Sequence, residues 1–483
     1  MAYTLMTGAV GFLGRYVLRD LLLAEVPVAV LVRDSKSESA QQRVETVMSR
    51  WDNEVGRALP RPVLLRGDID LPNLGLGTDD LDWVRQNCDA LFHSAAKVTF
   101  NADTPEEDLW DTNVRGTENV VALCRTAGIG QLHHVSTAFV CGLRPGPILE
   151  SELDLGQEYG NNYEKSKVAA EKIVHAAQDL DSVTIYRPAI IVGDSQTGYT
   201  TTFHGFYLPL RITHTLLSRV QLFDVSDIDL LDRLGLDGTE RKNVVPVDWV
   251  SAMMTYLITH PQLHGQTYHL TSSTGVACRL MQDAFLAAVR TSAEQGSYDG
   301  PVSIDLESLA QLEETFISQL EVYRSHWRND PTFDVRNTLA AVGLLPCPEI
   351  DRTMLDILSQ YAIRTNFGWP RPKAVTADFD VGQHLHRVVS TQASPPTPAG
   401  EIRCVGLQVN GSGGGQWHLR FNRNGLIAVE PGLTADCVSI YYLNSNTFVA
   451  LAQGRFTAEE AIATGRVVAF GPPFRSEELM QIV

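Results

Sequence analysis

The chain has 483 residues, of which 44% are hydrophobic and 20% are charged, and this length and composition predict a globular protein of two or three domains. Its formal net charge of −18 argues against nucleic acid and against binding to anionic membranes through bulk charge. No apolar run is long enough for a transmembrane helix, and a strand that begins near residue 3 leaves no room for a signal peptide, so we expect a cytoplasmic protein.

The first predicted strand, residues 3–7, runs into three glycines and then into a helix predicted from Arg15. Gly8, Gly11 and Gly14 follow a G-x-x-G-x-x-G spacing, which differs from the common G-x-G-x-x-G. Glycines here allow a tight turn, a close approach to a pyrophosphate and close packing of helix on strand. The helix N-terminus offers N–H groups to phosphates. A plain turn is the alternative, but the strand–turn–helix context favours nucleotide binding.

The second predicted strand, residues 27–32, ends at Arg33. An acidic residue there would bind the adenosine ribose of NAD, whereas Arg33 can meet a 2′-phosphate and favours NADPH. Asp34 weakens this inference, and a solvated surface arginine is the alternative. A third strand, residues 62–65, is followed by Asp68, which can accept a hydrogen bond from an adenine amino group.

Three later strands each end in small or polar residues: 89–93 before Ser94, Ala95 and Ala96; 132–135 before Ser136 and Thr137; 183–186 before Arg187 and Pro188. Helical patterns, such as 113–123, alternate with them. The alternation predicts a doubly wound parallel sheet, in which ligands bind at the carboxyl ends of the strands.

The chemical centre is expected at Tyr163 and Lys167, at the start of a helical run that continues to residue 177. Residues four apart lie on one helix face. A tyrosine with its usual pKa of about 10 is barely ionised at neutral pH, and a neighbouring ammonium favours the phenolate. With the hydroxyl of Thr137, this pair can bind a carbonyl and protonate it as hydride arrives. Alone, Tyr-x-x-x-Lys is also common on surface helices.

These motifs together resemble the extended short-chain dehydrogenases/reductases, and most closely the fatty acyl reductases and carrier-linked thioester reductase domains. The supporting motifs follow the family's order over residues 1–275: 7–14 (TGAVGFLG), 31–33 (LVR), 67–69 (GDI), 93–98 (HSAAKV), 113–117 (NVRGT), 135–138 (VSTA), 163–167 (YEKSK), 187–193 (RPAIIVG) and 243–248 (NVVPVD). The resemblance implies a Rossmann-type sheet with a mostly helical substrate lobe. The seven cysteines are scattered and include no C-x-x-C pair, so the sequence indicates neither a disulfide framework nor a zinc site, and we expect no metal.

The resemblance also implies roles for single residues. The catalytic residues would be Thr137, Tyr163 and Lys167, with Ser136 as an alternative hydroxyl. Lys167 would also hold the nicotinamide ribose, and Asn113 would support the active-site helix. The residues expected at the cofactor are Thr7, Gly8, Gly11, Phe12, Leu13, Gly14, Arg33, Asp68, Ile69, Ser94, Ala95, Ala96, Asn113, Lys167, Arg187 and Pro188.

Downstream, residues 200–240 are apolar and aromatic and form either the start of a substrate lobe or an ordinary core helix. Residues 276–386 are mostly helical in pattern, and 387–400 (RVVSTQASPPTPAG) are a predicted linker. Residues 401–483 contain the stretches 413–417 (GGGQW), 435–436 (AD), 448–454 (FVALAQG) and 461–467 (AIATGRV). With these they resemble the sterol carrier protein type two domain, which implies a small α+β fold and a lipid ligand. A packed domain used for dimerisation or docking is the alternative.

The function expected from these residues is NADPH-dependent reduction of a hydrophobic acyl thioester, carried by coenzyme A or by a separate carrier protein, to an aldehyde or alcohol. The alternatives are an oxidoreductase of ketones or hydroxyls on a lipid or sterol, and a lipid-binding module without turnover. Arg33 disfavours a sugar-nucleotide epimerase with tightly held NAD. Candidates for a basic patch that binds the anionic carrier are Arg211, Arg219, Arg241 and Lys242.

Overall fold

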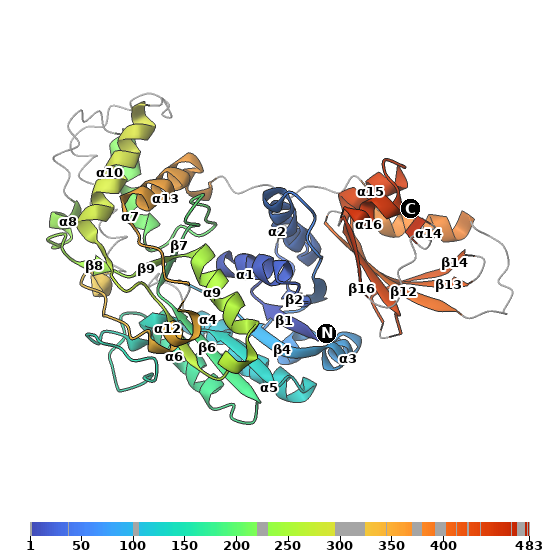
Figure 1. Ribbon diagram of the computed structural model, residues 1–483, viewed down its shortest axis with the longest axis horizontal. Helices are drawn as coiled ribbons and strands as arrows, with labels where there is room; N and C mark the ends of the chain where they lie inside the picture. Colours follow the sequence, from blue (N-terminus) through green and yellow to red (C-terminus); the bar gives the residue numbers. More distant parts are fainter. Residues whose placement is uncertain are drawn as a thin grey trace. The chain divides into compact units, whose positions relative to one another are not determined.

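The computed structural model describes residues 2–36, 38–99, 106–219, 230–294, 324–343, 345–369, 379–391, 402–411, 413–422, 425–434, 436–464, 466–470, 479–480 and 482 (Figure 1). The chain forms two compact units. Unit 1 comprises Met1–Ala95, Ala122–Gly130 and Lys373–Val483, and unit 2 comprises Ala96–Val121 and Gln131–Pro372. The C-terminal segment therefore belongs to the same unit as the first strands. Among the described helices, none is both long and apolar enough to cross a membrane.

Unit 1 contains parallel strands in the order β4-β1-β2-β3. Their bounds are β1 (Tyr3–Thr7), β2 (Val28–Val32), β3 (Val63–Arg66) and β4 (Cys88–His93). The connecting helices are α1 (Phe12–Leu23), α2 (Ala40–Val55) and α3 (Thr78–Asn87). Every residue of β2 is buried, as expected for a strand covered on both faces. This part of the chain confirms the predicted α/β pattern.

Local sequence signals fix the ends of α2. The Ser39 hydroxyl accepts a hydrogen bond from the Gln42 N–H, and the Gln42 side chain accepts one from the Ser39 N–H. This capping box satisfies two N–H groups that have no partner inside the helix. The helix ends at Gly56, whose φ of +76° is the left-handed conformation that glycine adopts without strain.

Unit 2 contains parallel strands in the order β10-β6-β5. Its main strands are β5 (Gln131–Val135), β6 (Ser182–Pro188) and β10 (Thr267–Leu270), and its short strands are β7 (Ile190–Val192), β8 (Arg241–Lys242), β9 (Val244–Pro246) and β11 (Val276–Ala277). The helices are α4 (Glu106–Trp110), α5 (Gly116–Ala127, which continues into unit 1), α6 (Asn162–His175), α7 (Tyr207–Arg219), α8 (Leu230–Arg233), α9 (Val247–Ile258), α10 (Cys278–Glu294), α12 (Arg336–Val342) and α13 (Arg352–Arg364).

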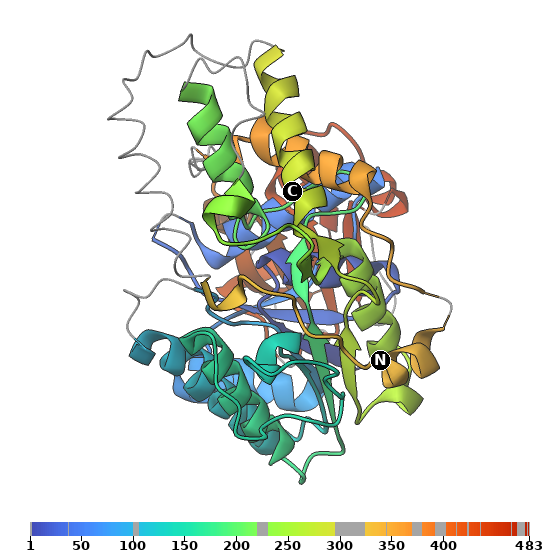
Figure 2. The ribbon, with the colours of Figure 1, turned by 90° about the vertical axis from the view of Figure 1, so that its left-hand side faces the viewer.

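Helices α7, α10 and α13 pack together in unit 2 (Figure 2). Tyr207 and Leu210 of α7, Phe285 of α10 and Leu358 of α13 are buried in their shared core. Within the apolar segment 200–240, Tyr207–Arg219 thus form a helix whose buried residues Tyr207 and Leu210 belong to this core. Residues 220–229 of that segment lie outside the described residues.

The C-terminal segment forms a five-stranded mixed sheet in the order β14-β13-β12-β15-β16. The strands are β12 (Arg403–Asn410), β13 (Gly415–Asn422), β14 (Gly425–Pro431), β15 (Ser439–Asn444) and β16 (Val467–Phe470), and the helices are α14 (Val381–Thr391), α15 (Ser445–Ala452) and α16 (Ala458–Ala463). The three helices cover one face of the sheet over an apolar core (Figure 1). The predicted start of the linker at residue 387 is wrong, because α14 continues to Thr391 with buried apolar residues on one side. Residues 392–400 lie outside the described residues.

The opposite face of the C-terminal sheet contacts β3 through glutamine side chains. Gln408 is fully buried on β12. Its Nε2 donates to the Pro62 carbonyl at 2.7 Å, and its Oε1 accepts from the Leu64 N–H at 3.0 Å. The Gln416 amide donates to the Leu64 carbonyl at 2.6 Å. Leu64 belongs to β3, the last strand in the order β4-β1-β2-β3, so these amides satisfy backbone groups that no further strand pairs.

This contact predicts the effect of Gln408→Ala. The substitution leaves the buried Leu64 N–H and Pro62 carbonyl without partners, which costs about 1–3 kcal/mol for each unsatisfied group. We expect a lower urea midpoint for unfolding of the full chain, followed by tryptophan fluorescence. The matched control is Gln383→Ala, at an exposed position of α14. Equal midpoints for the two variants would contradict the assigned role of Gln408.

Candidate active site

The glycine turn of unit 1, Gly8–Gly14, follows β1 and packs tightly against the residues that follow β4. A Cβ on Gly8 would lie 2.7 Å from the Ala95 nitrogen, and one on Gly14 would lie 2.0 Å from the Gly8 carbonyl oxygen. Gly8 also has a φ of +77°. Thr7 fixes the same region, because its Oγ1 lies 2.8 Å from His93 Nδ1 and accepts from the Ala95 N–H at 3.3 Å. The glycines are therefore required by backbone crowding at this turn.

Helix α1 begins at Phe12, three residues before the predicted start at Arg15. The prediction is wrong because Gly14 lies in the first helical turn, where its lack of a side chain permits the close contact with Gly8. Gly11 is the N-cap and supplies no side-chain hydrogen bond, and the first turn contains no acidic residue. The N-terminal N–H groups of α1 are thus suited to an anion such as a pyrophosphate.

Arg33 extends from the end of β2 with its side chain 61% exposed and pairs with Asp68 at 2.9 Å. Asp34 is engaged elsewhere: it accepts a hydrogen bond from the Ala40 N–H at the start of α2 and pairs with Arg66 at 3.2 Å. Arg43 of α2 donates to the Arg33 carbonyl at 2.6 Å. Burial and the charge of Arg33 lower the pKa of Arg43. The guanidinium groups of Arg33 and Arg43 therefore lie near each other beyond the end of β2.

Helix α6 carries Tyr163 and Lys167 in unit 2. Asn161 caps the helix by accepting a hydrogen bond from the Glu164 N–H at 2.9 Å, so Tyr163 lies in its first turn. Lys167 is buried, and its Nζ donates to the Val135 carbonyl at 2.7 Å. Val135 is the last residue of β5 and precedes Ser136 and Thr137. This bond ties the lysine to the strand end where the catalytic hydroxyl was predicted.

The pKa of Tyr163 is shifted in the direction opposite to the prediction. Burial, with a smaller effect of Glu164, raises the pKa of Tyr163, so this side chain is a neutral hydroxyl at neutral pH. We expected a shift in the opposite direction from the Lys167 ammonium. Burial lowers the pKa of Lys167 to about 8, opposed by Glu171. The lysine remains mostly protonated at neutral pH, and the tyrosine is in the form that donates a proton.

The hydroxyls of Ser136 and Thr137, the two candidates for the catalytic hydroxyl, have different surroundings. Ser136 Oγ is buried and donates to Glu171 Oε2 at 2.5 Å. Thr137 Oγ1 accepts from the Phe139 N–H at 3.3 Å and lies 3.5 Å from the Pro188 carbonyl oxygen. Thr137 is therefore held beside the end of β6 by weaker contacts, whereas the Ser136 proton is committed to a buried carboxylate.

Glu171 lies one turn beyond Lys167 on α6 and is fully buried. Arg187, also buried, pairs with it at 2.5 Å through Nη2 and at 3.0 Å through Nε. Burial alone raises the pKa of Glu171. Hydrogen bonds from His175, Arg187 and Ser136, together with the charge of Arg187, outweigh this and lower the pKa to about 2. Arg187, predicted to lie near the nicotinamide, is thus engaged in an internal ion pair.

Asn113 supports α6 from a neighbouring π-helical turn, Asp111–Arg115. Its Nδ2 donates to Ser166 Oγ at 2.9 Å and to the Lys97 carbonyl at 3.0 Å, and its Oδ1 accepts from the Lys97 N–H. Ser166 in turn donates to the Tyr163 carbonyl at 2.7 Å. A buried amide therefore links the first turn of the helix to the segment after β4, as expected for a supporting residue.

The other predicted cofactor residues lie at the ends of strands or at the start of α1. In the first turn of α1, Phe12 is partly exposed and Leu13 is buried. Ile69, which follows β3, is buried, and Pro188 is the last residue of β6. After β4, Ser94 and Ala95 are partly buried and Ala96 is exposed.

Sequence reasoning missed Arg43 and Glu171. The signal for Glu171 was its place four residues after Lys167, on the face that carries Tyr163.

Of the predicted basic patch, Lys242 is paired with Asp330 and donates to the His326 carbonyl, so it is not a free surface charge. Arg211 and Arg241 are exposed, and the side chain of Arg219 lies outside the described residues.

Residues 6–254 match the NAD-binding family described as "Male sterility protein". The chain belongs to this family. Nonribosomal peptide synthetase asaC of Aspergillus flavus is 28% identical over 284 residues, 56% of this chain and 26% of that protein. Fatty acyl-CoA reductase wat of Drosophila melanogaster is 27% identical over 276 residues, 50% of this chain and 51% of that protein. The chain thus spans from about a quarter to half of these family relatives.

Among solved structures, the terminal R domain from the myxalamid PKS-NRPS biosynthetic pathway has a TM-score of 0.59 and 28% identity, and the match covers 76% of this chain and 92% of that domain. Together with the family match, this confirms the predicted resemblance to the extended reductases. The family match also confirms the prediction of a Rossmann-type domain that binds NAD(P).

The Glu171–Arg187 pair predicts a large loss of stability for Glu171→Gln. The change leaves the Arg187 charge buried without its partner, which typically costs about 3–5 kcal/mol. We expect a lower urea midpoint for the full chain at pH 7. Glu158→Gln, at an exposed position before α6, is the matched control and should leave the midpoint unchanged. A loss below about 1 kcal/mol for Glu171→Gln would show that the pair does not hold unit 2 together.

Proposed function

We propose that the chain is an NADPH-dependent reductase of acyl thioesters, the reaction class suggested by its similarity to a terminal R domain and to a fatty acyl-CoA reductase. The observation that carries the proposal is the arrangement on α6. There Tyr163 is a neutral hydroxyl one turn from Lys167, whose ammonium is fixed to the strand end that carries Thr137. A carbonyl acceptor fits this set of groups, since one hydroxyl can bind its oxygen while the other donates a proton.

The backbone of unit 1 fits a dinucleotide. A Cβ at Gly8 or Gly14 would fill the turn, and the uncapped start of α1 suits a pyrophosphate. We assign the 2′-phosphate of NADPH to Arg33 and Arg43, because Asp34 is occupied by Arg66 and by the start of α2. Binding of the phosphate would compete with the exposed Arg33–Asp68 pair, which is worth little on its own.

When bound, NADPH supplies the hydride to the thioester carbonyl carbon. Tyr163 donates its proton to the carbonyl oxygen, and Thr137 donates a hydrogen bond to the same oxygen as negative charge develops there. The charged Lys167 stabilises the tyrosinate that forms. The resulting hemithioacetal breaks its carbon–sulfur bond, releasing an aldehyde and a free thiol. One NADPH and one proton are consumed for each thiol released.

The acyl carrier in this proposal is coenzyme A or a separate carrier protein, and the product is an aldehyde or, after a second turnover, an alcohol. A lipid ligand in the C-terminal domain stays a prediction. The glutamine contacts of its sheet with β3 favour the alternative, a docking role. An oxidoreductase of ketones would use the same hydroxyls but would release no thiol.

The proposal predicts coupled loss of NADPH and appearance of free thiol when the full chain is mixed with a long-chain acyl-coenzyme A or an acylated carrier protein. Tyr163→Phe should reduce kcat by about 10²–10⁴-fold, because the proton donor is lost. Tyr256→Phe removes the hydroxyl of another half-buried tyrosine and should keep the rate. Loss of NADPH without thiol would mean ketone reduction. An unchanged Tyr163→Phe rate would remove this residue as the acid.

Arg33→Ala and Arg43→Ala test the cofactor. A charge-assisted hydrogen bond contributes about 1.5–3 kcal/mol, so each change should raise KM for NADPH by about 10- to 100-fold and leave KM for NADH unchanged. Arg57→Ala, an exposed arginine beyond α2, is the control. Equal effects on NADH and NADPH would show that these guanidinium groups do not bind the 2′-phosphate.

A further inference from the structure

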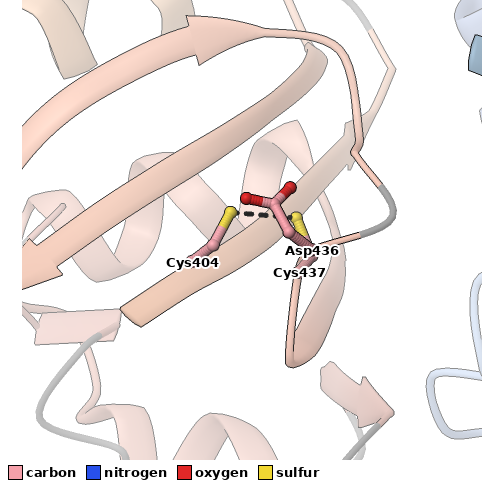
Figure 3. A group of neighbouring side chains, drawn as sticks. All are labelled: Cys404, Asp436 and Cys437. Atoms are coloured by element: carbon pink, nitrogen blue, oxygen red, sulfur yellow. Dashed lines mark hydrogen bonds between the residues drawn. The ribbon is translucent and has the colours of Figure 1, made fainter. Parts of the chain in front are cut away.

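Two cysteines that are 33 positions apart in the sequence meet in the C-terminal sheet domain. Cys404 is buried on β12, and Cys437 is half-buried two residues before β15. Their sulfur atoms lie 3.4 Å apart (Figure 3). The Val438 N–H donates to the Cys404 carbonyl at 2.9 Å, and this backbone bond holds the two segments in register.

Asp436 completes a group of three acidic or thiol side chains. One ligand atom each from Cys404, Asp436 and Cys437 lies within 4.8 Å of the other two, and no other such group was found among the described residues. Figure 3 shows the carboxylate turned toward the two sulfurs. The Cys437 N–H donates to the Thr434 carbonyl at 3.2 Å, and this turn presents Asp436 and Cys437 to Cys404 on the neighbouring strand.

The spacing of the group fits a tetrahedral metal ion. With a metal–sulfur distance of about 2.3 Å, two thiolates of a zinc site lie about 3.8 Å apart. The observed 3.4 Å is close to this value. A disulfide has a sulfur–sulfur distance of about 2.05 Å, so its formation would require a larger movement of the two sulfurs.

The surroundings also suit a cation. The Thr434 hydroxyl hydrogen-bonds Asp436 Oδ1, which orients the carboxylate as an outer partner of a metal ligand does. The Thr434 oxygen lies 3.6 Å from Cys437 Sγ and 3.8 Å from Cys404 Sγ. Two thiolates and a carboxylate carry one negative charge more than a divalent cation neutralises, and Arg420, 3.9 Å from Asp436, can balance it.

We propose that Cys404, Asp436 and Cys437 bind a thiol-seeking divalent cation of the zinc type, with water as the fourth ligand. The exposed carboxylate leaves room for that water. The ion would join the segment before β15 to β12. Strands β12 and β15 are parallel, hydrogen-bonded neighbours that lie far apart along the chain. The proposed reduction uses none of the ion's three protein ligands.

The test uses the full chain, reduced with a phosphine, freed of metal with a chelator and titrated without oxygen with Co²⁺ as a spectroscopic substitute for Zn²⁺. We expect one equivalent to bind with a thiolate-to-cobalt charge-transfer band. Zn²⁺ should then displace Co²⁺ and raise the thermal midpoint of the C-terminal domain. Cys437→Ser should abolish the band, and Thr434→Val should weaken binding by about 10- to 100-fold. Cys278→Ser, which removes a half-buried thiol in α10, is the control and should bind as wild type.

A wild-type chain without the charge-transfer band, or a band of equal strength in Cys437→Ser, would overturn the proposal. If the chain binds no Co²⁺ and mild treatment with a glutathione-type disulfide instead joins the peptides of Cys404 and Cys437, the pair is a redox dithiol and the metal site is wrong. If Cys437→Ser is poorly folded, Asp436→Asn provides the second test, because it keeps both thiols and should still lose affinity. None of these readouts depends on reductase activity.

Discussion

The buried carboxylate of Glu171 is the constraint on which the arrangement of the candidate site in unit 2 depends. A fully buried charge must be paired, and Arg187, Ser136 and His175 supply the partners. These partners fix α6 against β6 and the end of β5. They also decide which groups remain for a substrate, since Ser136 and Arg187 are committed to the carboxylate. Thr137 is left as the hydroxyl for the proposed chemistry.

In the C-terminal sheet, buried polar groups are likewise paired, here by glutamine side chains. One face is covered by α14, α15 and α16 over an apolar core, and the other presents Gln408 and Gln416 to β3. An edge strand leaves backbone N–H and carbonyl groups without partners, and buried glutamine amides satisfy them where no further strand is present. The two glutamine side chains therefore join the C-terminal sheet to β3 within unit 1 by specific polar contacts.

Local patterns made much of this molecule predictable, because a strand, a glycine turn and a helix are encoded by neighbouring residues. The glycine turn and the Tyr163–Lys167 spacing were found in this way, and backbone crowding explains why Gly8 and Gly14 are glycines. Contacts between distant residues were not predictable. The Glu171–Arg187 pair joins a helix to a strand, and Gln408 contacts a strand more than 300 positions earlier in the chain. No periodicity or motif reports such contacts, since they arise only when the elements pack.

The most direct test of the central claim is the transfer of deuterium from NADPH deuterated at the reactive carbon to an acyl thioester, followed by mass spectrometry of the product. We expect one deuterium on the aldehyde carbon, or two on an alcohol carbon, with one free thiol for each product molecule. Product without deuterium at that carbon, or deuterium on a carbon elsewhere in the acyl chain with the thioester intact, would contradict thioester reduction by this chain.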